Sequence, residues 1–135
     1  MPAGKRKASR LRPAARQRSA GVKTSARAAE LHHNVYVVLL DPKVAGHPSV
    51  LRLNPARDPT KPCVYVGMTG LDPTERFANH KRGYKSAWTV HRYGVRLLPE
   101  MYECFNPMPF HIAAEMEAGL AEDLRAEGYT VTGGK

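Results

Sequence analysis

The sequence predicts an α/β protein of the α+β type: a small central antiparallel sheet of about three strands, flanked by helices and preceded by a disordered basic arm. Two β-branched apolar runs, at residues 34–40 and 62–67, are typical of buried strands. A capped helical segment follows the second run, and an amphipathic segment spans about residues 109–127. A chain of 135 residues has room for one small domain and a tail. We therefore assign residues 31–135 to the domain.

Residues 1–30 carry most of the net charge. Nine of the 21 lysines and arginines lie there against a single acid, Glu30, so this segment contributes +8 of the total of +9. It has too few large apolar side chains to offset its chain entropy, and we expect it to be disordered. One interpretation is an arm that binds nucleic-acid phosphates, and the other is a solubilising or organelle-targeting extension. The phosphate contacts that we single out in the arm are Lys5, Arg6 and Lys7.

The composition also limits the compartment and the metal chemistry. No apolar run approaches the length of a membrane span and the N-terminus lacks a secretory apolar region, so we expect an intracellular protein, cytoplasmic or nucleoid-associated, without a membrane partner. Cys63 and Cys104 lack metal-ligand spacing. We expect both to be buried thiols, with a disulfide or redox pair as the alternative.

The first two apolar runs predict a hairpin. Residues 34–40 form a strand that bears Tyr36, and residues 62–67 form a second strand that bears Tyr65. The connection between them, residues 41–61, contains four prolines and little periodicity. We therefore expect a long loop at the tip of the hairpin, with a short extension near residues 50–53.

The second strand leads into a helix over about residues 72–82 with three start signals. These signals are Asp72 at the cap, Pro73 in the first helical position and Glu75 three residues after the cap. Arg76 and His80 lie four residues apart and therefore share one face of this helix. A cation and a titratable imidazole are thus expected side by side, just beyond the end of a strand.

The next segments are shorter. Residues 86–93 predict a helix capped by Ser86, in which we expect Trp88 to pack in the core, with a base-stacking platform as the alternative. Residues 94–105 predict a third strand that Pro99 interrupts. The C-terminal residues 129–135 predict a short final strand.

The helix at about residues 109–127 places a carboxylate among apolar side chains. At about 100° per residue, Glu117 lies within roughly 60° of each apolar position of one stripe. Those positions are Phe110, Ala113, Ala114, Leu120, Ala121 and Leu124. A buried carboxylate is costly unless a cation, a metal or several donors meet it. Two purely structural explanations of Glu117 are also open. It could form a buried ion pair with Arg76, or its side chain could reach solvent from the end of the stripe.

Taken in order, these residues resemble the GIY-YIG nuclease domain over roughly residues 34–131. The matching positions are Asn34-Val35-Tyr36, Tyr65-Val66-Gly67, Arg76, His80 and Glu117. Asn34 stands where the family has its first glycine, and the insertion between the two tripeptides is longer than usual. The resemblance implies a metal-dependent DNA endonuclease, with Glu117 as the metal ligand and Tyr65 as the general base.

The same residues suit phosphodiester hydrolysis on chemical grounds. Glu117 can hold one divalent ion, Mg²⁺ or Mn²⁺, and Arg76 offers a cationic fork to a phosphate. A phenol, Tyr65 or Tyr36, would take the proton of the attacking water directly or through His80. The flanking cations would grip neighbouring phosphates, although a solvated helix end explains them equally well. These cations are Lys81, Arg82 and Lys85.

We therefore predict a DNA endonuclease with a single-metal site. The alternative is a non-catalytic module that binds DNA, RNA or the ribosome and keeps the fold without turnover. Because no separate sequence-reading domain is apparent, we expect specificity to come from the structure of the DNA, from residues 41–61, from the arm or from a protein partner.

Overall fold

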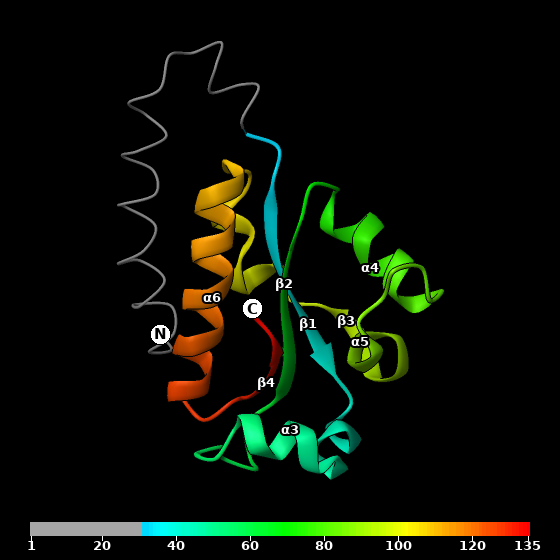
Figure 1. Cartoon of the computed structure of the whole chain (residues 1–135), viewed down its shortest axis with the longest axis vertical. Helices are drawn as coiled ribbons and strands as arrows, with labels where there is room; N and C mark the ends of the chain where they lie inside the picture. Colours follow the sequence, from blue (N-terminus) through cyan, green and yellow to red (C-terminus); the bar gives the residue numbers. More distant parts are fainter. Residues whose placement is uncertain (1–30) are drawn as a thin grey trace.

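The computed structural model describes residues 31–135, so the predicted arm and its Lys5, Arg6 and Lys7 lie outside the described residues. The described chain forms one four-stranded sheet with helices on both faces (Figure 1), which confirms the predicted α+β class. The strands are β1 (Asn34–Leu40), β2 (Cys63–Thr69), β3 (Gly94–Leu97) and β4 (Thr130–Gly133), in the order β3-β1-β2-β4. No helix among the described residues is long and apolar enough to cross a membrane.

The predicted hairpin forms the centre of the sheet. β1 and β2 pair antiparallel from Asn34 opposite Thr69 to Leu40 opposite Cys63. β3 adds to β1 as a further antiparallel neighbour. The final strand β4 is present as predicted, and it pairs parallel to β2, so the sheet is mixed. A parallel pair needs a crossover connection, which the long C-terminal helix provides.

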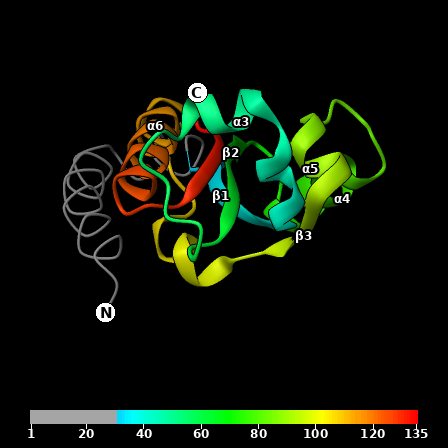
Figure 2. The ribbon, with the colours of Figure 1, turned by 90° about the horizontal axis from the view of Figure 1, so that it is seen from below.

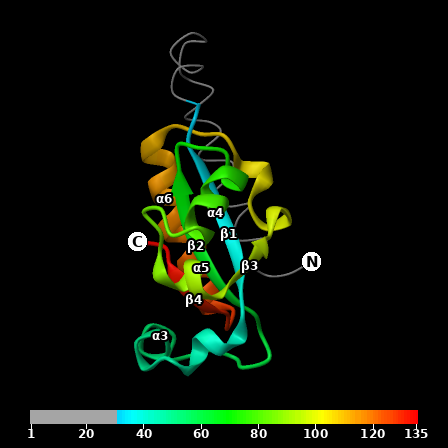
Figure 3. The same cartoon turned by 90° about the vertical axis from the view of Figure 1, so that its right-hand side faces the viewer.

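The helices form two layers around the sheet. α6 (Phe110–Ala126) covers one face, and α4 (Pro73–Lys81) and α5 (Trp88–Tyr93) cover the other, as the two views in Figures 1 and 2 agree. Figure 3 views the molecule from the α4 and α5 side. Asp72 caps α4 as predicted, because its carboxylate accepts a hydrogen bond from the backbone N–H of Thr74 at 2.8 Å. The predicted Ser86 cap is wrong, since α5 begins after Ala87, which has no capping side chain.

Residues 41–61 are more ordered than the predicted loop. They contain the 3₁₀ helix η1 (Pro42–Gly46) and α3 (Pro48–Leu53), so the expected extension at residues 50–53 is wrong. Pro48 favours the first helical position, and Val50 gives α3 a buried residue. The side chain of the buried Asn54 then joins the insertion to β4. Its Nδ2 donates to the backbone carbonyls of Val50 and Val131, and its Oδ1 accepts a hydrogen bond from the backbone N–H of Val131.

The third predicted strand is shorter than expected. β3 ends at Leu97, two residues before Pro99, and two 3₁₀ turns follow it. These turns are η2 (Pro99–Met101) and η3 (Glu103–Phe105). Proline lacks the N–H that a paired strand requires, so the chain leaves the sheet there.

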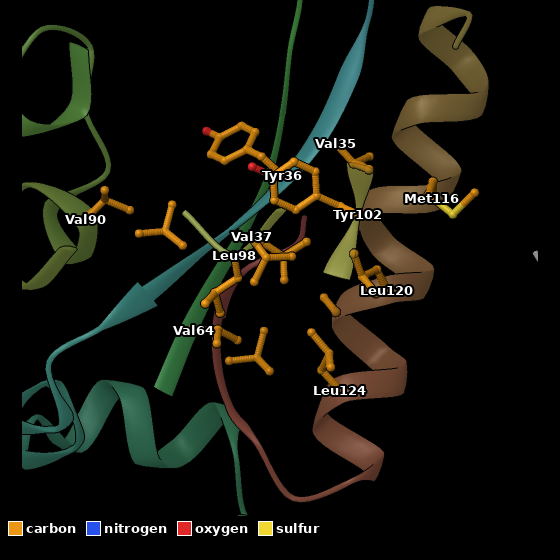
Figure 4. Close-up of a cluster of buried hydrophobic side chains, with 14 of the residues drawn as sticks. Val35, Tyr36, Val37, Val64, Val90, Leu98, Tyr102, Met116, Leu120 and Leu124 are labelled. Atoms are coloured by element: carbon orange, nitrogen blue, oxygen red, sulfur yellow. The ribbon is translucent and has the colours of Figure 1, made fainter. Parts of the chain in front are cut away.

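The core lies mainly between the sheet and α6. In Figure 4, Leu120 and Leu124 of α6 lie on the side of the helix that faces Val37 and Val64 of the strands. Two expectations about burial are wrong: Phe110, at the first turn of α6, is 61% exposed, and Cys104 is exposed. Cys63 is buried, as predicted.

Replacing Asn54 tests how strongly the insertion is fastened to the sheet. Asn54→Ala removes three hydrogen bonds and leaves buried backbone groups of two elements without partners, which costs about 2 kcal/mol or more in the free energy of unfolding. Urea denaturation of the full chain measures this loss. The matched control is Ser49→Ala, at an exposed position of α3, the helix that Asn54 follows. It should change the free energy of unfolding by less than about 0.5 kcal/mol. Equal stability of the two variants would contradict the anchoring role.

Candidate functional site

The hairpin register places Tyr36 and Tyr65 on one face of the sheet. Tyr36 lies opposite Gly67, and Val38 lies opposite Tyr65. Residues directly opposite each other in a pair of strands point to the same side, and residues two apart on one strand do so as well. The two tyrosines are therefore diagonal neighbours, with ring centroids 6.0 Å apart. The face they share is the one that α4 and α5 cover.

Gly67 supplies the space that the Tyr36 ring occupies. A Cβ atom at this position would lie 2.7 Å from both Cζ and Oη of Tyr36, and 2.8 Å from Cε2 of Tyr65. Both distances are shorter than carbon atoms in contact allow. Gly67, the last residue of the tripeptide Tyr65-Val66-Gly67, is therefore needed for the placement of both phenols. The sequence pattern did not indicate this role.

His80 is held between Tyr36 and the start of α5. Its Nε2 lies 2.8 Å from Oη of Tyr36, and its Nδ1 accepts the backbone N–H of Ala87 at 3.0 Å. A backbone N–H always donates, so Nδ1 carries no proton and the neutral ring has its proton on Nε2. Burial, with a smaller contribution from the Arg76 charge, lowers the pKa of His80 to about 4. His80 is thus neutral near pH 7 and donates to Tyr36.

This tautomer does not fit the expected proton relay. A relay requires a free acceptor nitrogen, and both ring nitrogens of His80 are already committed. Ala87 acts here through its backbone N–H alone, so its side chain gives no signal in the sequence. It follows that His80 orients and polarises Tyr36 rather than accepting its proton.

The two phenols differ in accessibility. Tyr36 is 1% exposed, whereas Tyr65 is partly exposed. Burial raises the pKa of Tyr36 far above its ordinary value, and it also raises the pKa of Tyr65. The interaction between their hydroxyls raises the pKa of Tyr36 and lowers that of Tyr65, as when Tyr36 donates and Tyr65 accepts. Hydrogen bonds therefore run in one direction from Ala87 through His80 to Tyr36, and Tyr36 lies beside Tyr65 and acts on its pKa.

Arg76 lies beside both phenols and beside the segment that follows α4. Its positive charge opposes the raised pKa of Tyr36 and of Tyr65. Its guanidinium also donates to the carbonyl of Lys85 at 2.7 Å and, at the long limit of 3.4 Å, to that of Tyr84. Arg76 therefore joins the tyrosine cluster to the turn between α4 and α5.

Glu117 comes from the opposite helical layer. Its side chain is 9% exposed, which confirms its expected burial. Burial raises the pKa of its carboxyl, and Lys135 opposes this shift. The anticipated ion pair with Arg76 is absent from the described chain, where the Glu117 carboxylate has neither a hydrogen bond nor an ion pair and Arg76 bonds to backbone carbonyls instead. The charge of Glu117 nevertheless raises the pKa of Tyr65, so the two groups are electrostatically coupled.

A metal ion would find a single carboxylate in this site. Among residues 31–135 there is no group of three or more His, Cys, Asp or Glu side chains that could form a protein cage. Mg²⁺ usually keeps several waters and binds one or two carboxylates together with substrate phosphates. The buried carboxylate of Glu117, without a cation bound to it by the described residues, fits that mode of binding.

The cations that we expect to bind phosphates differ in the groups to which they donate hydrogen bonds. The Lys81 ammonium donates to the carbonyls of His91 and Gly94 at 3.3 and 2.9 Å, so it stabilises the end of α5. Arg82 donates to the side chain of Asn79, and both Arg82 and Lys85 are exposed. Lys81 therefore has a structural contact that neither interpretation anticipated, and Arg82 and Lys85 stay candidates for phosphate contacts.

Comparisons with protein-family models, with curated proteins and with solved structures find no match to this chain. The geometry of the site itself is therefore the basis for the function proposed below.

Gly67→Ala tests the packing that places the two phenols. The added methyl overlaps the Tyr36 ring, so we expect a loss of about 1–3 kcal/mol in the free energy of unfolding. The matched control is Gly46→Ala, where an added Cβ has no heavy atom within 4 Å. Chemical denaturation of both variants gives the comparison, and a Gly67→Ala protein as stable as the Gly46→Ala protein would refute the packing argument.

The neutral state of His80 predicts a dependence of stability on pH. The folded pKa of about 4 lies below the ordinary histidine pKa of 6.5, so between these pH values the unfolded chain binds a proton at His80 that the folded chain does not. This contribution is fully present above pH 6.5 and decreases as the pH falls toward 4. Between pH 7.5 and 4.5 it amounts to about 2 kcal/mol.

Urea denaturation of wild type and His80→Gln at both pH values isolates this contribution. The destabilisation caused by His80→Gln should be smaller at pH 4.5 than at pH 7.5, because glutamine does not titrate. A difference between the two proteins that stays constant with pH would contradict a buried neutral His80.

Proposed function

We propose that the protein is a metal-dependent endonuclease that hydrolyses DNA phosphodiester bonds at a site of the GIY-YIG type. One observation carries the proposal: hydrogen bonds hold His80 and Tyr36 next to Tyr65, whose pKa responds to the charge of the buried Glu117 carboxylate. Arg76 lies next to the same cluster. A buried carboxylate to which residues 31–135 offer no hydrogen bond or ion pair costs free energy, and ionisable groups perturbed in this way are concentrated at functional sites.

Hydrolysis of a phosphodiester requires a proton acceptor for the attacking water and positive charge at the phosphoryl oxygens. Tyr65 is the candidate acceptor, because it is the phenol of the pair that reaches solvent. Tyr36 assists by donating to Tyr65, and His80 keeps Tyr36 in the orientation that permits this. This hydrogen bond stabilises the phenolate of Tyr65, the form that can take the proton of the water and that becomes a neutral phenol when it does so.

Charge at the phosphate comes from two sources in this proposal. Arg76 presents a guanidinium, the group best suited to phosphate oxygens, on a helix that is fixed by its Asp72 cap. Glu117 would hold one Mg²⁺ or Mn²⁺ ion, which supplies Lewis acidity and stabilises the leaving oxygen. The charge of Glu117 is one cause of the raised pKa of Tyr65. A cation on this carboxylate would therefore lower the pKa of Tyr65 and favour the phenolate, which is the form that accepts a proton.

Plasmid nicking in the presence of Mg²⁺ or Mn²⁺ tests the proposal. Tyr65→Phe, Arg76→Ala and Glu117→Ala should each reduce the cleavage rate by about 10²-fold or more, since each removes a group that acts in the transition state. Glu122→Ala, an exposed position on the same helix as Glu117, is the matched control and should cleave at the wild-type rate. DNA affinity measured by fluorescence anisotropy should remain within severalfold for all four variants.

The same assay distinguishes the alternative function. A well-folded wild type that binds DNA but cleaves no substrate with any divalent metal would refute the enzyme and favour the non-catalytic nucleic-acid-binding module.

A further inference from the structure

The single tryptophan of the chain lies at the surface. We expected Trp88 in the core, but its side chain is 48% exposed, and the nearby Tyr84 is 53% exposed. Trp88 begins α5, and Tyr84 lies in the turn between α4 and α5. Two large aromatic side chains so close together in sequence are therefore both open to solvent, which costs hydrophobic stabilisation and requires an explanation.

The turn that carries these aromatic residues is fastened to the proposed active site. Arg76 donates to the carbonyls of Tyr84 and Lys85, and the N–H of Ala87 donates to His80. Lys85 has a φ of 48°, in the left-handed region that side chains other than glycine rarely adopt. The same residues that form the site thus hold the turn in an unfavourable conformation, so Tyr84 and Trp88 have fixed positions relative to the site.

Trp88 is further fixed by the insertion at residues 41–61. Its ring makes an edge contact with His47, at 5.0 Å between centroids and 70° between planes. His47 in turn shares a 2.7 Å hydrogen bond with the hydroxyl of Tyr93. The insertion therefore holds the exposed indole in place. This reduces the side-chain conformational entropy that would be lost when a ligand binds there.

The charge around these side chains is positive. Residues 76–99 contain six lysines and arginines and no acid, whereas the rest of the described chain contains six bases and eleven acids. Lys85 and Arg82 lie 5.6 and 6.0 Å from the centroid of the Tyr84 ring. Exposed aromatic rings interleaved with cations are the combination that binds single-stranded nucleic acids, because bases stack on the rings and phosphates pair with the cations.

We propose that Tyr84 and Trp88 stack on unpaired bases, so that the substrate is DNA with single-stranded nucleotides next to the bond to be cleaved. This inference rests on the proposed nuclease function and narrows its substrate class. In a continuous duplex the base faces are covered by their neighbours, and an aromatic ring can reach only groove edges and backbone. Unpaired nucleotides expose the faces that these two rings fit. The basic residues of the turn then hold the phosphates that lead toward Arg76.

The single tryptophan provides a direct probe, since all indole fluorescence reports on Trp88. The full chain carrying Glu117→Gln, which prevents cleavage under the proposed mechanism, is titrated with a 12-nucleotide oligothymidylate and with a blunt duplex of equal phosphate content. We expect saturable quenching of the emission by the single strand and little quenching by the duplex. Binding of the single strand, seen by anisotropy of a labelled oligonucleotide, without any quenching would overturn the proposal.

Variants separate stacking from charge. Tyr84→Ala and Trp88→Ala should each weaken single-strand binding by about tenfold and duplex binding by less than about twofold. Phe110→Ala is the matched control, because Phe110 is an exposed aromatic residue on the opposite helical layer; it should change neither affinity. Tyr84→Phe should retain single-strand binding, and circular dichroism confirms that the variants fold.

Two further outcomes would overturn the inference. Single-strand affinities within twofold of wild type for both alanine variants would exclude stacking. Equal quenching by polyglutamate would indicate a surface for acidic proteins instead. Neither outcome depends on turnover: plasmid nicking by wild type tests the nuclease separately, so a failed substrate class and a failed enzyme give different results.

Discussion

The hydrogen bond from the backbone N–H of Ala87 to Nδ1 of His80 determines the chemistry of the whole site. It fixes the tautomer of a buried imidazole, and the tautomer fixes the direction in which Tyr36 is polarised. If Nδ1 carried the proton instead, Nε2 of His80 would accept a hydrogen bond from the Tyr36 hydroxyl, and Tyr36 would be polarised in the opposite direction. One main-chain contact between two helices thus decides how the buried phenol of Tyr36 is polarised, and the base role proposed for Tyr65 depends on this contact.

The sheet contributes the other constraint, which is register. Because Tyr36 lies opposite Gly67, its ring occupies volume that a side chain would otherwise fill, and Tyr65 reaches the same face two residues away. β4 pairs with β2 only from Cys63 to Val66, so among the described strands the outer end of β2 has no neighbour on that side. The charge of Glu117 acts on Tyr65 although the two residues come from opposite layers. The site therefore lies where a short edge strand ends.

Stability and function conflict at several places in this domain. A carboxylate is buried without a partner among the described residues, the backbone of Lys85 adopts a left-handed conformation, and the rings of Tyr84 and Trp88 are exposed. Each costs free energy that a purely structural domain would avoid. They lie next to Arg76 or Tyr65, on the turn that Arg76 holds, or at the start of α5, which follows this turn. Their concentration in one region is the strongest reason to regard it as functional.

The sequence by itself determined whatever depends on near neighbours along the chain. The Asp72 cap and the apolar stripe around Glu117 follow from spacing within one helix, so the helix start and the burial of the carboxylate were both predicted. The tertiary structure alone decided which partners meet. The tautomer of His80 depends on a backbone N–H seven residues away that carries no side-chain signal, and the exposure of Trp88 depends on where the 41–61 insertion folds. Contacts between separate elements set these features, and no local pattern encodes them.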